Sequence, residues 1–436
     1  MNATRKVILK YLGLGAVAVP VAGIGLIAAM GPGTLERQRE AARRDGLPLL
    51  PEDLKRTPPV PDEQNAAPLL RELHHLWRSK PDKEIDPWIA VAHNMCRKSE
   101  DASFRAAFAK GVGKFPEFVR LAEAAAERPH CDFGCDWSRG MKLEFPELSV
   151  TRHAASFFAA RALIAGEPSS AFSDIARAAH LGTLLQETPC LLPTIAGSTA
   201  LEMAHKSYLD ALKRFGPSPL ARKALNAFGP IPYPEFYCRG EVVIGIATMT
   251  LLREGKMNRT EEDIPESEGM CGDGAFWETL AKVSPLAGPY WEERLILFWR
   301  EVYAILRATR DDPIQRGNLL EAQVNRWSED KLHTPQNLIA LILGPMYAQG
   351  IISTPQKAAT ARALRETALS LLETKAKTGA FPEKPSLPRD PYSNRPLGYR
   401  REGAGCALWS VGPDGKDDGG VAYSKDRRLL DLVVRL

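Results

Sequence analysis

The sequence predicts a mainly α-helical protein: an irregular array of antiparallel helical hairpins, with one N-terminal transmembrane helix and a small C-terminal antiparallel β-subdomain. Three observations predict this fold. Apolar residues recur at spacings of three and four over residues 64–378, as they do on one face of a helix. A long segment near the N-terminus lacks charge, and strand-like runs occur only after Gly379. At 436 residues, a large helical domain with a small appendage, or two domains, is expected.

The transmembrane helix is expected over residues 11–31, behind a cytoplasmic tail of residues 1–10. Tyr11 to Met30 is a run of twenty residues without a charge. At 1.5 Å per residue it spans about 30 Å, the thickness of the hydrocarbon core of a bilayer. Two alternatives stay open: a secretory signal cleaved near Ala29-Met-Gly31, and a helix buried in the protein.

Residues 32–63 are expected to join the anchor to the folded body. A short charged helix is predicted over Thr34–Asp45. The following stretch, Leu47–Asp62, contains five prolines, and this composition favours a stiff, partly extended spacer.

The all-α body is expected over residues 64–378. Its apolar stripes predict that five side chains are largely buried: Phe158, Ile175, Tyr208, Leu295 and Leu371. Later helices are expected over Phe236–Glu254, Trp291–Arg310 and Ala358–Lys377. No fixed period repeats along the body, so an irregular assembly is favoured over a true repeat protein.

Residues 379–436 form the predicted β-subdomain. After a turn at Asp390-Pro391, the chain offers three strand-like runs: Leu397–Arg401, Cys406–Val411 and Leu430–Leu436. The first two are expected to pair in antiparallel fashion, and the third to add a strand.

Two motifs give this ending a resemblance. One is Leu387-Pro-Arg-Asp-Pro-Tyr-Ser-Asn-Arg-Pro-Leu-Gly-Tyr-Arg-Arg, and the other is Ala407-Leu-Trp-Ser-Val-Gly-Pro-Asp-Gly-Lys-Asp-Asp-Gly-Gly. Together they resemble the C-terminal β-subdomain of the major pseudopilins of type II secretion. The ending is also similar to that of uncharacterised, membrane-anchored, helix-rich bacterial proteins. The N-terminus departs from the pilin pattern, because it lacks the Gly-Phe processing site and the acidic residue that follows it.

The resemblance implies a compartment and a ligand. It places the chain in the bacterial inner membrane as a single-pass protein, with most of its residues outside the cytoplasm. It also implies calcium, which the equivalent acidic loop of the pseudopilins holds. Here Asp414, Asp417 and Asp418 would supply hard oxygen ligands. The alternative is a plain Pro-Asp-Gly turn followed by a solvated loop.

A second polar segment lies in the body. His130-Cys-Asp-Phe-Gly-Cys-Asp-Trp137 gathers one histidine, two cysteines and two aspartates in eight residues. The spacing of Cys131 and Cys135 is not that of a zinc knuckle, and a metal would need further ligands. A turn packed by Phe133 and Trp137, with or without a disulfide, is therefore favoured.

The histidines offer a weaker candidate site. His153, His180 and His205 fall in three successive predicted helices and would line one pocket if the helices converged. Half-buried structural roles are the commoner use of such residues. Three tryptophans lie at helical spacing and are expected in the core: Trp291, Trp299 and Trp327.

The predicted function is that of a membrane-anchored, extracytoplasmic scaffold or protein-binding module. No catalytic signature occurs in the sequence. The 57 basic and 53 acidic residues give a formal charge of +4 without a basic stripe, which argues against nucleic acid. The membrane, through residues 11–31, and one or more proteins are the expected partners. Two alternatives stay open: a component of a type II secretion or pilus-like apparatus, and an enzyme with no recognisable motif.

Overall fold

The computed structural model describes residues 31–79, 89–94, 96, 102–111, 113–256, 274–329, 335–422 and 431–436. The predicted transmembrane span, residues 11–31, lies outside this part of the chain except for Gly31. Within the described ranges, no helix combines the length and the apolar character that a bilayer crossing requires.

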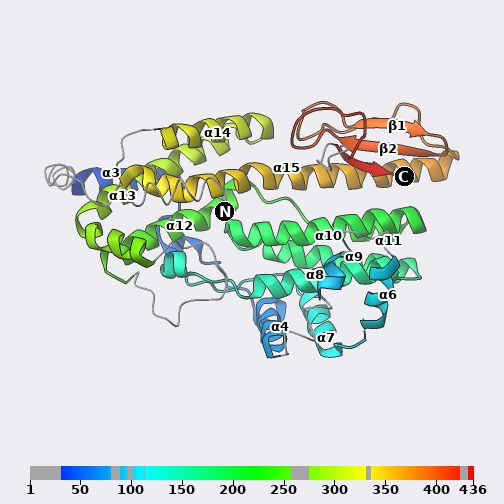
Figure 1. The fold of residues 1–436 in the computed structure, drawn as a ribbon, viewed down its shortest axis with the longest axis horizontal. Helices are drawn as coiled ribbons and strands as arrows, with labels where there is room; N and C mark the ends of the chain where they lie inside the picture. Colours follow the sequence, from blue (N-terminus) through cyan, green and yellow to red (C-terminus); the bar gives the residue numbers. More distant parts are fainter. Residues whose placement is uncertain are drawn as a thin grey trace.

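The chain is mainly helical, with one small sheet at its C-terminal end (Figure 1). The first helices are α3 (Gly31–Arg44), α4 (Ala67–Ser79), α6 (Ala102–Gly111), α7 (Pro116–Ala126), α8 (Glu147–Ile164), α9 (Pro168–Leu185) and α10 (Leu191–Phe215). They are followed by α11 (Pro219–Asn226), α12 (Pro234–Arg253), α13 (Gly274–Ala308), α14 (Pro313–Glu329) and α15 (Pro335–Thr378). Short 3-10 turns form at η1 (Pro51–Leu54), η2 (Asp62–Gln64) and η3 (Trp137–Lys142).

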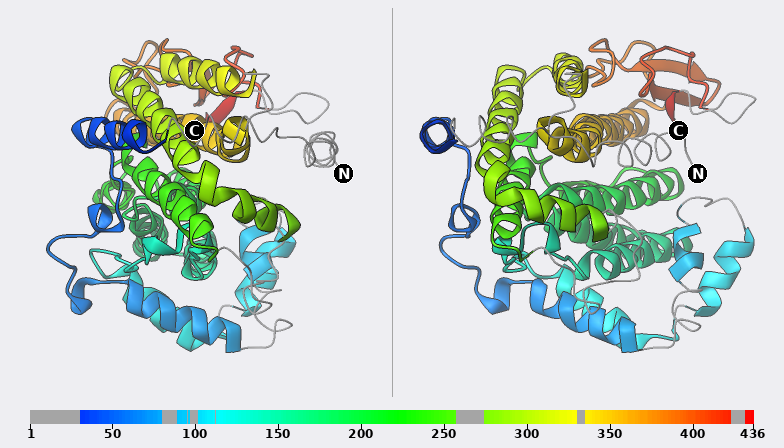
Figure 2. Two further views of the ribbon diagram at one scale, coloured as in Figure 1. Left: turned by 90° about the vertical axis from the view of Figure 1, so that its left-hand side faces the viewer. Right: turned by 60° about the vertical axis from the view of Figure 1, so that its left-hand side comes forward.

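The helices are stacked around two main hydrophobic cores, and a third cluster of four buried residues comprises Trp137, Cys190, Val243 and Ile244. In Figure 1, α8, α9 and α10 form a central layer, with α4, α6 and α7 below it and α15 above it. The larger core joins this central layer to the second half of α15 and to the sheet. The smaller core lies among α3, α12 and α13, and Figure 2 shows these helices gathered at one end of the molecule. Among the described elements, α15 runs from one core to the other, and α10 joins them as well, because Leu191 at its beginning lies in the smaller core.

The central layer depends on a close approach of α9 and α10. A Cβ atom added to Gly197 would lie 2.5 Å from the carbonyl oxygen of Gly182, and one added to Gly182 would lie 2.9 Å from the carbonyl oxygen of Gly197. Each separation is shorter than a non-bonded contact allows. The two backbones can therefore meet only because both positions lack a side chain.

The predicted apolar stripes are confirmed. All five marker residues are buried, with exposed fractions of 3% or less: Phe158, Ile175, Tyr208, Leu295 and Leu371. Trp291 and Trp299 lie in the smaller core, as expected, and the side chain of Trp327 lies outside the described part. No strand occurs before Gly379 in the residues that the structure describes.

One helix is longer than predicted. A helix was expected over Ala358–Lys377. Proline removes a backbone donor and usually ends a helix, and Pro355 lies just before this range. The structure instead continues α15 through Pro355, from Pro335 to Thr378. The prediction of a start at Ala358 is therefore wrong, and the crevice described below explains how the proline is accommodated.

The sheet forms as predicted. Strands β1 (Gly398–Glu402), β2 (Gly405–Ser410) and β3 (Leu432–Arg435) are antiparallel, in the order β1-β2-β3. Tyr399 pairs with Leu408, and Leu408 pairs with Val434. The inner face of β2 packs against the larger core.

The segment before the body lies against it. Leu47 and Leu49 are 4% exposed and belong to the smaller core. Arg239 donates to the carbonyl oxygen of Asp53 at 2.7 Å, and Arg300 pairs with Asp45 at 2.6 Å. The proline-containing stretch is thus held by side chains from α12 and α13.

The close approach of α9 and α10 generates a stability prediction. We expect Gly197→Ala to lower the free energy of unfolding by about 1–3 kcal/mol, because the added methyl group must push the two helices apart. The measurement is chemical denaturation of the purified chain.

Gly166→Ala is the matched control, because no atom lies within 4 Å of a Cβ built at that position. It should change stability by less than about 1 kcal/mol. A Gly197→Ala variant that is as stable as the control would contradict the close crossing.

Candidate functional site

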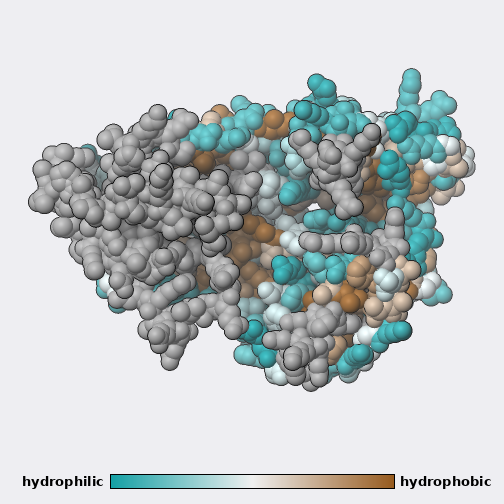
Figure 3. Space-filling view, in the orientation of Figure 1, coloured by the Kyte–Doolittle hydropathy of each residue, from teal (hydrophilic) through white to brown (hydrophobic). Residues whose placement is uncertain are grey.

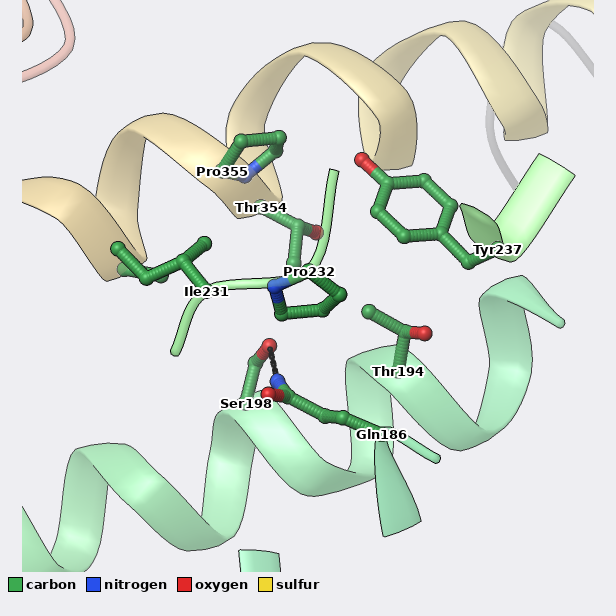
Figure 4. A pocket seen from close by; sticks show the side chains of 9 residues that line it. Gln186, Thr194, Ser198, Ile231, Pro232, Tyr237, Thr354 and Pro355 are labelled. Atoms are coloured by element: carbon green, nitrogen blue, oxygen red, sulfur yellow. Dashed lines mark hydrogen bonds between the residues drawn. The ribbon is translucent and has the colours of Figure 1, made fainter. Parts of the chain in front are cut away.

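A narrow crevice lies between α10 and α15. Its lining residues come from the position just after α9, from α10, from the segment before α12, from α12 itself and from α15. They are Gln186, Thr194, Ser198, Ile231, Pro232, Tyr237, Thr354, Pro355 and Ala358. Figure 4 shows Ile231 and Pro232 on an extended segment that passes between the two helices. The crevice has almost no room for a water molecule, so it is a packed seam of polar and apolar side chains rather than an open pocket.

The polar groups of the crevice come from helix ends and helix faces. The Gln186 amide, just after α9, donates to the Ser198 hydroxyl at 3.0 Å, as the dashed line in Figure 4 shows. The Thr194 hydroxyl donates to the carbonyl oxygen of Cys190 at 2.9 Å. The buried Glu241 carboxylate accepts from the backbone N–H of Leu191 at 2.8 Å. A negative group at this position stabilises the beginning of α10.

The crevice also explains how α15 accommodates Pro355. Proline has no N–H, so the carbonyl oxygen of Ile351, four residues earlier, loses its normal helical partner. The Tyr237 hydroxyl donates to that oxygen at 3.4 Å. A side chain of α12 therefore replaces a missing backbone hydrogen bond of α15. The sequence carried one signal of this contact, a proline inside a helical pattern, but it does not indicate which side chain compensates.

The acidic loop predicted to hold calcium binds its own polypeptide. Asp417 accepts from the indole N–H of Trp409 and from the backbone N–H of Gly419, both at 2.9 Å. Asp414 accepts from the backbone N–H of Lys416 at 3.2 Å. One oxygen of Asp418, Oδ2, is buried without a hydrogen-bond partner. In the described part of the chain, no three acidic, histidine or cysteine side chains gather as metal ligands would. The calcium site stays a prediction.

Two carboxylates outside the predicted set hold this loop in place. Asp390 accepts from the Ser410 hydroxyl at 2.8 Å and from the backbone N–H of Val411 at 2.9 Å, where the loop begins. Asp431 accepts from the backbone N–H of Gly420 at 2.7 Å, where it ends. Both carboxylates are almost fully buried. Burial raises the pKa of Asp431, although its backbone hydrogen bonds oppose that rise. The turn motif at Asp390 thus fixes the geometry of a loop twenty residues later.

The polar segment from His130 to Trp137 is a packed turn. Phe133 and Trp137 are buried, as expected, and Cys131 and Cys135 are free thiols. Glu187, just after α9, accepts from the backbone N–H of Cys131 at 3.2 Å and lies 3.3 Å from Nδ1 of His130.

Side chains before and within α4 hold the rest of this turn. Asn65 exchanges two hydrogen bonds with the backbone of Asp132, at 2.9 and 3.0 Å. Arg71 donates to the carbonyl oxygen of Phe133 and pairs with Glu147 at 3.2 Å. These contacts tie the turn to the helices around it.

The three histidines predicted as possible pocket residues have different neighbours. His153 packs edge-on against Trp77 of α4, with ring centroids 4.9 Å apart. The ring of His180 makes a 2.7 Å contact with the carbonyl oxygen of Arg128. His205 lies near Arg365 of α15, whose charge contributes to lowering the pKa of His205 after the larger effect of burial. No shared pocket follows from these contacts.

Comparisons with known proteins identify no relative. No family model, no curated protein and no solved structure matches this chain. The functional argument therefore depends on the sequence and on the geometry of this chain.

The Tyr237 contact can be tested by a double-mutant cycle. We expect Tyr237→Phe to lower the free energy of unfolding by about 1 kcal/mol, because the carbonyl oxygen of Ile351 is left without a donor. In a Pro355→Ala background the backbone N–H returns, so the same substitution should cost less than half as much. Tyr233→Phe, at a side chain that is 48% exposed, is the control. If Tyr237→Phe lowered the free energy of unfolding equally in both backgrounds, the Tyr237 hydrogen bond could not be a replacement for the backbone bond that Pro355 removes.

The burial of the His153 imidazole generates a pH prediction. Burial, together with Arg152 and His93, lowers the pKa of His153 from 6.5 to about 4. The unfolded chain therefore binds this proton more readily, and the stabilisation present above pH 6.5 is lost as the pH falls towards 4.

We expect the wild-type melting temperature to fall more between pH 7 and pH 5 than that of His153→Gln. His75→Gln, at an exposed position on α4, should keep the wild-type pH dependence. Parallel curves for wild type and His153→Gln would show that another group carries the acid sensitivity.

Proposed function

We propose that this chain is a membrane-anchored, extracytoplasmic scaffold that binds a protein partner through the beginning of α10. The observation that carries the proposal is a pair of exposed apolar side chains on successive turns of α10, whose first residues are held by a hydrogen bond to Glu241. Leu192 is 44% exposed and Ile195 is 39% exposed. Figure 3 shows hydrophobic residues gathered on this face of the molecule, near the beginning of α10.

The surroundings of this pair support binding by a preorganised surface. The hydrogen bond from Leu191 to Glu241 and the crossing at Gly182 hold α10 from two sides. Because this surface is already ordered, binding a partner there would cost little conformational entropy. Thr194 and Ser198 line the adjacent crevice and would add polar contacts at the rim. Interfaces commonly combine an apolar centre with such a rim.

The membrane part of the proposal rests on the sequence. The uncharged run from Tyr11 to Met30 is long enough to span a bilayer, and the pseudopilin-like ending favours a body outside the cytoplasm. The expected location is the bacterial inner membrane.

The C-terminal sheet supports a second candidate, a component of a type II secretion or pilus-like apparatus. The observation that favours it is the connection from the Asp390 turn through β1 and β2 into an acidic loop, the arrangement that the resemblance implies. Co-purification with a secretion apparatus in the experiment below would favour this role over a more general scaffold.

Site-specific cross-linking tests the proposed surface. A photoreactive residue at position 195 of the full chain, expressed in its own host, should give a discrete adduct with one protein in the membrane fraction. We expect the same probe at position 220 to give none, although Leu220 is 41% exposed and therefore equally accessible. Leu192→Asp should reduce the adduct at position 195 at least about tenfold, because a charge would be buried in the interface.

Two outcomes would contradict the proposal. Recovery of the full chain in the soluble fraction would contradict the proposed membrane anchor. Equal adduct yields from positions 195 and 220 would contradict the proposed binding surface.

A further inference from the structure

A buried arginine without a negative partner lies on the second half of α15. Arg365 is 6% exposed, and its Nε atom is buried without a hydrogen-bond partner. Its guanidinium lies over the ring of Phe228, whose centroid is 3.8 Å from Cζ. A buried charge that lacks an ion pair destabilises the fold, so its presence calls for a counterpart.

The facing helix contributes further polar atoms that lack partners. Tyr208 of α10 is fully buried, and its hydroxyl makes no hydrogen bond within the described structure. The Nδ1 atom of His205, one turn earlier on the same face, is likewise buried and unpartnered. The Tyr208 ring packs edge-on against Phe228 at 5.9 Å. Tyr208 and Arg365 thus contact the same aromatic ring from two helices.

The nearby carboxylates are already paired with other arginines. Glu373 binds Arg222 at 2.5 Å, and Glu366 binds Arg362 at 2.7 Å. Burial lowers the pKa of Arg365 to about 10, so the guanidinium still carries its charge at neutral pH. The cluster therefore combines a positive charge with groups that can donate hydrogen bonds, while the matching acceptor is missing.

This cluster continues the crevice along the same two helices. Ser198 and Ala358 line the crevice, and His205 and Arg365 follow each of them by seven residues, or two helical turns. Polar side chains therefore recur along the interface of α10 and α15, among the apolar residues that both helices contribute to the larger core. In Figure 3 this face of the molecule is hollowed between the row that contains α15 and the row that contains α10.

We propose that an oxyanion, the carboxylate or phosphate group of a small ligand, binds between the Arg365 guanidinium and the Tyr208 hydroxyl, and that the packed seam between α10 and α15 opens to admit it. A planar guanidinium can donate two parallel hydrogen bonds to either group. The Tyr208 hydroxyl donates a third, and Nδ1 of His205 lies at the edge of the site. This role is independent of the proposed partner surface at Leu192 and Ile195.

Thermal unfolding of the full chain in different anions tests the site. At pH 7 and equal ionic strength, phosphate or acetate at about ten times its Kd should raise the melting temperature by about 2 °C or more relative to chloride. A response to phosphate alone indicates a phosphate ligand, and a response to acetate alone indicates a carboxylate. Equal melting temperatures in all three salts would overturn the proposal.

Two variants decide whether Arg365 carries the response. Arg365→Met should abolish it and raise the melting temperature in chloride, because an unpaired buried charge is removed. Lys377→Met removes a positive charge from an exposed position at the end of the same helix and should leave the anion response unchanged. An anion response that persists in Arg365→Met would place the binding site elsewhere.

A milder variant serves if Arg365→Met does not fold. Tyr208→Phe keeps the ring that packs on Phe228 and removes only the hydroxyl. In calorimetric titration with the responding anion, its affinity should be about tenfold weaker than that of the wild type. Unchanged affinity would exclude Tyr208 from the site and overturn the proposed geometry.

Discussion

The crossing of α9 and α10 at Gly182 and Gly197 is the constraint on which the arrangement of the other helices depends. Because neither residue has a side chain, the backbones of α9 and α10 meet directly at this crossing. Glu241 then fixes the beginning of the same helix. With α10 held in this way, its remaining faces present Thr194, Ser198 and Tyr208 to the space below α15. The crevice and the cluster of Arg365, Tyr208 and His205 are therefore consequences of how α10 is positioned.

The sequence predicted the parts of the fold that depend on local periodicity. Phe158, Ile175 and Tyr208 are buried because spacings of three and four place them on one face of a helix, whatever that face later meets. The antiparallel sheet was predictable for a similar reason, since strand-forming runs and turn residues alternate after Gly379.

The sequence could not predict what depends on contacts between distant segments. Tyr237 and Ile351 are far apart in the chain, and only folding brings a hydroxyl to the carbonyl group that Pro355 leaves free. The same is true of Arg365, which has the appearance of an ordinary surface residue until α10 covers it. The acidic loop shows the limit differently. Asp417 is visible as an acidic residue, but its hydrogen bond with Trp409 depends on how the loop folds back on the sheet.

Because α15 belongs to both hydrophobic cores, the two cores are not thermodynamically independent. Ile351 lies in the smaller core, whereas Leu364 and Leu371 lie in the larger one. Unfolding of either core would strip half of one continuous helix of its packing, and a helix half that stands alone in water is only marginally stable. Formation of one core therefore stabilises α15 and, through α15, favours formation of the other core. A chain of this length, whose size would favour two separate domains, is thereby coupled into a single cooperative unit.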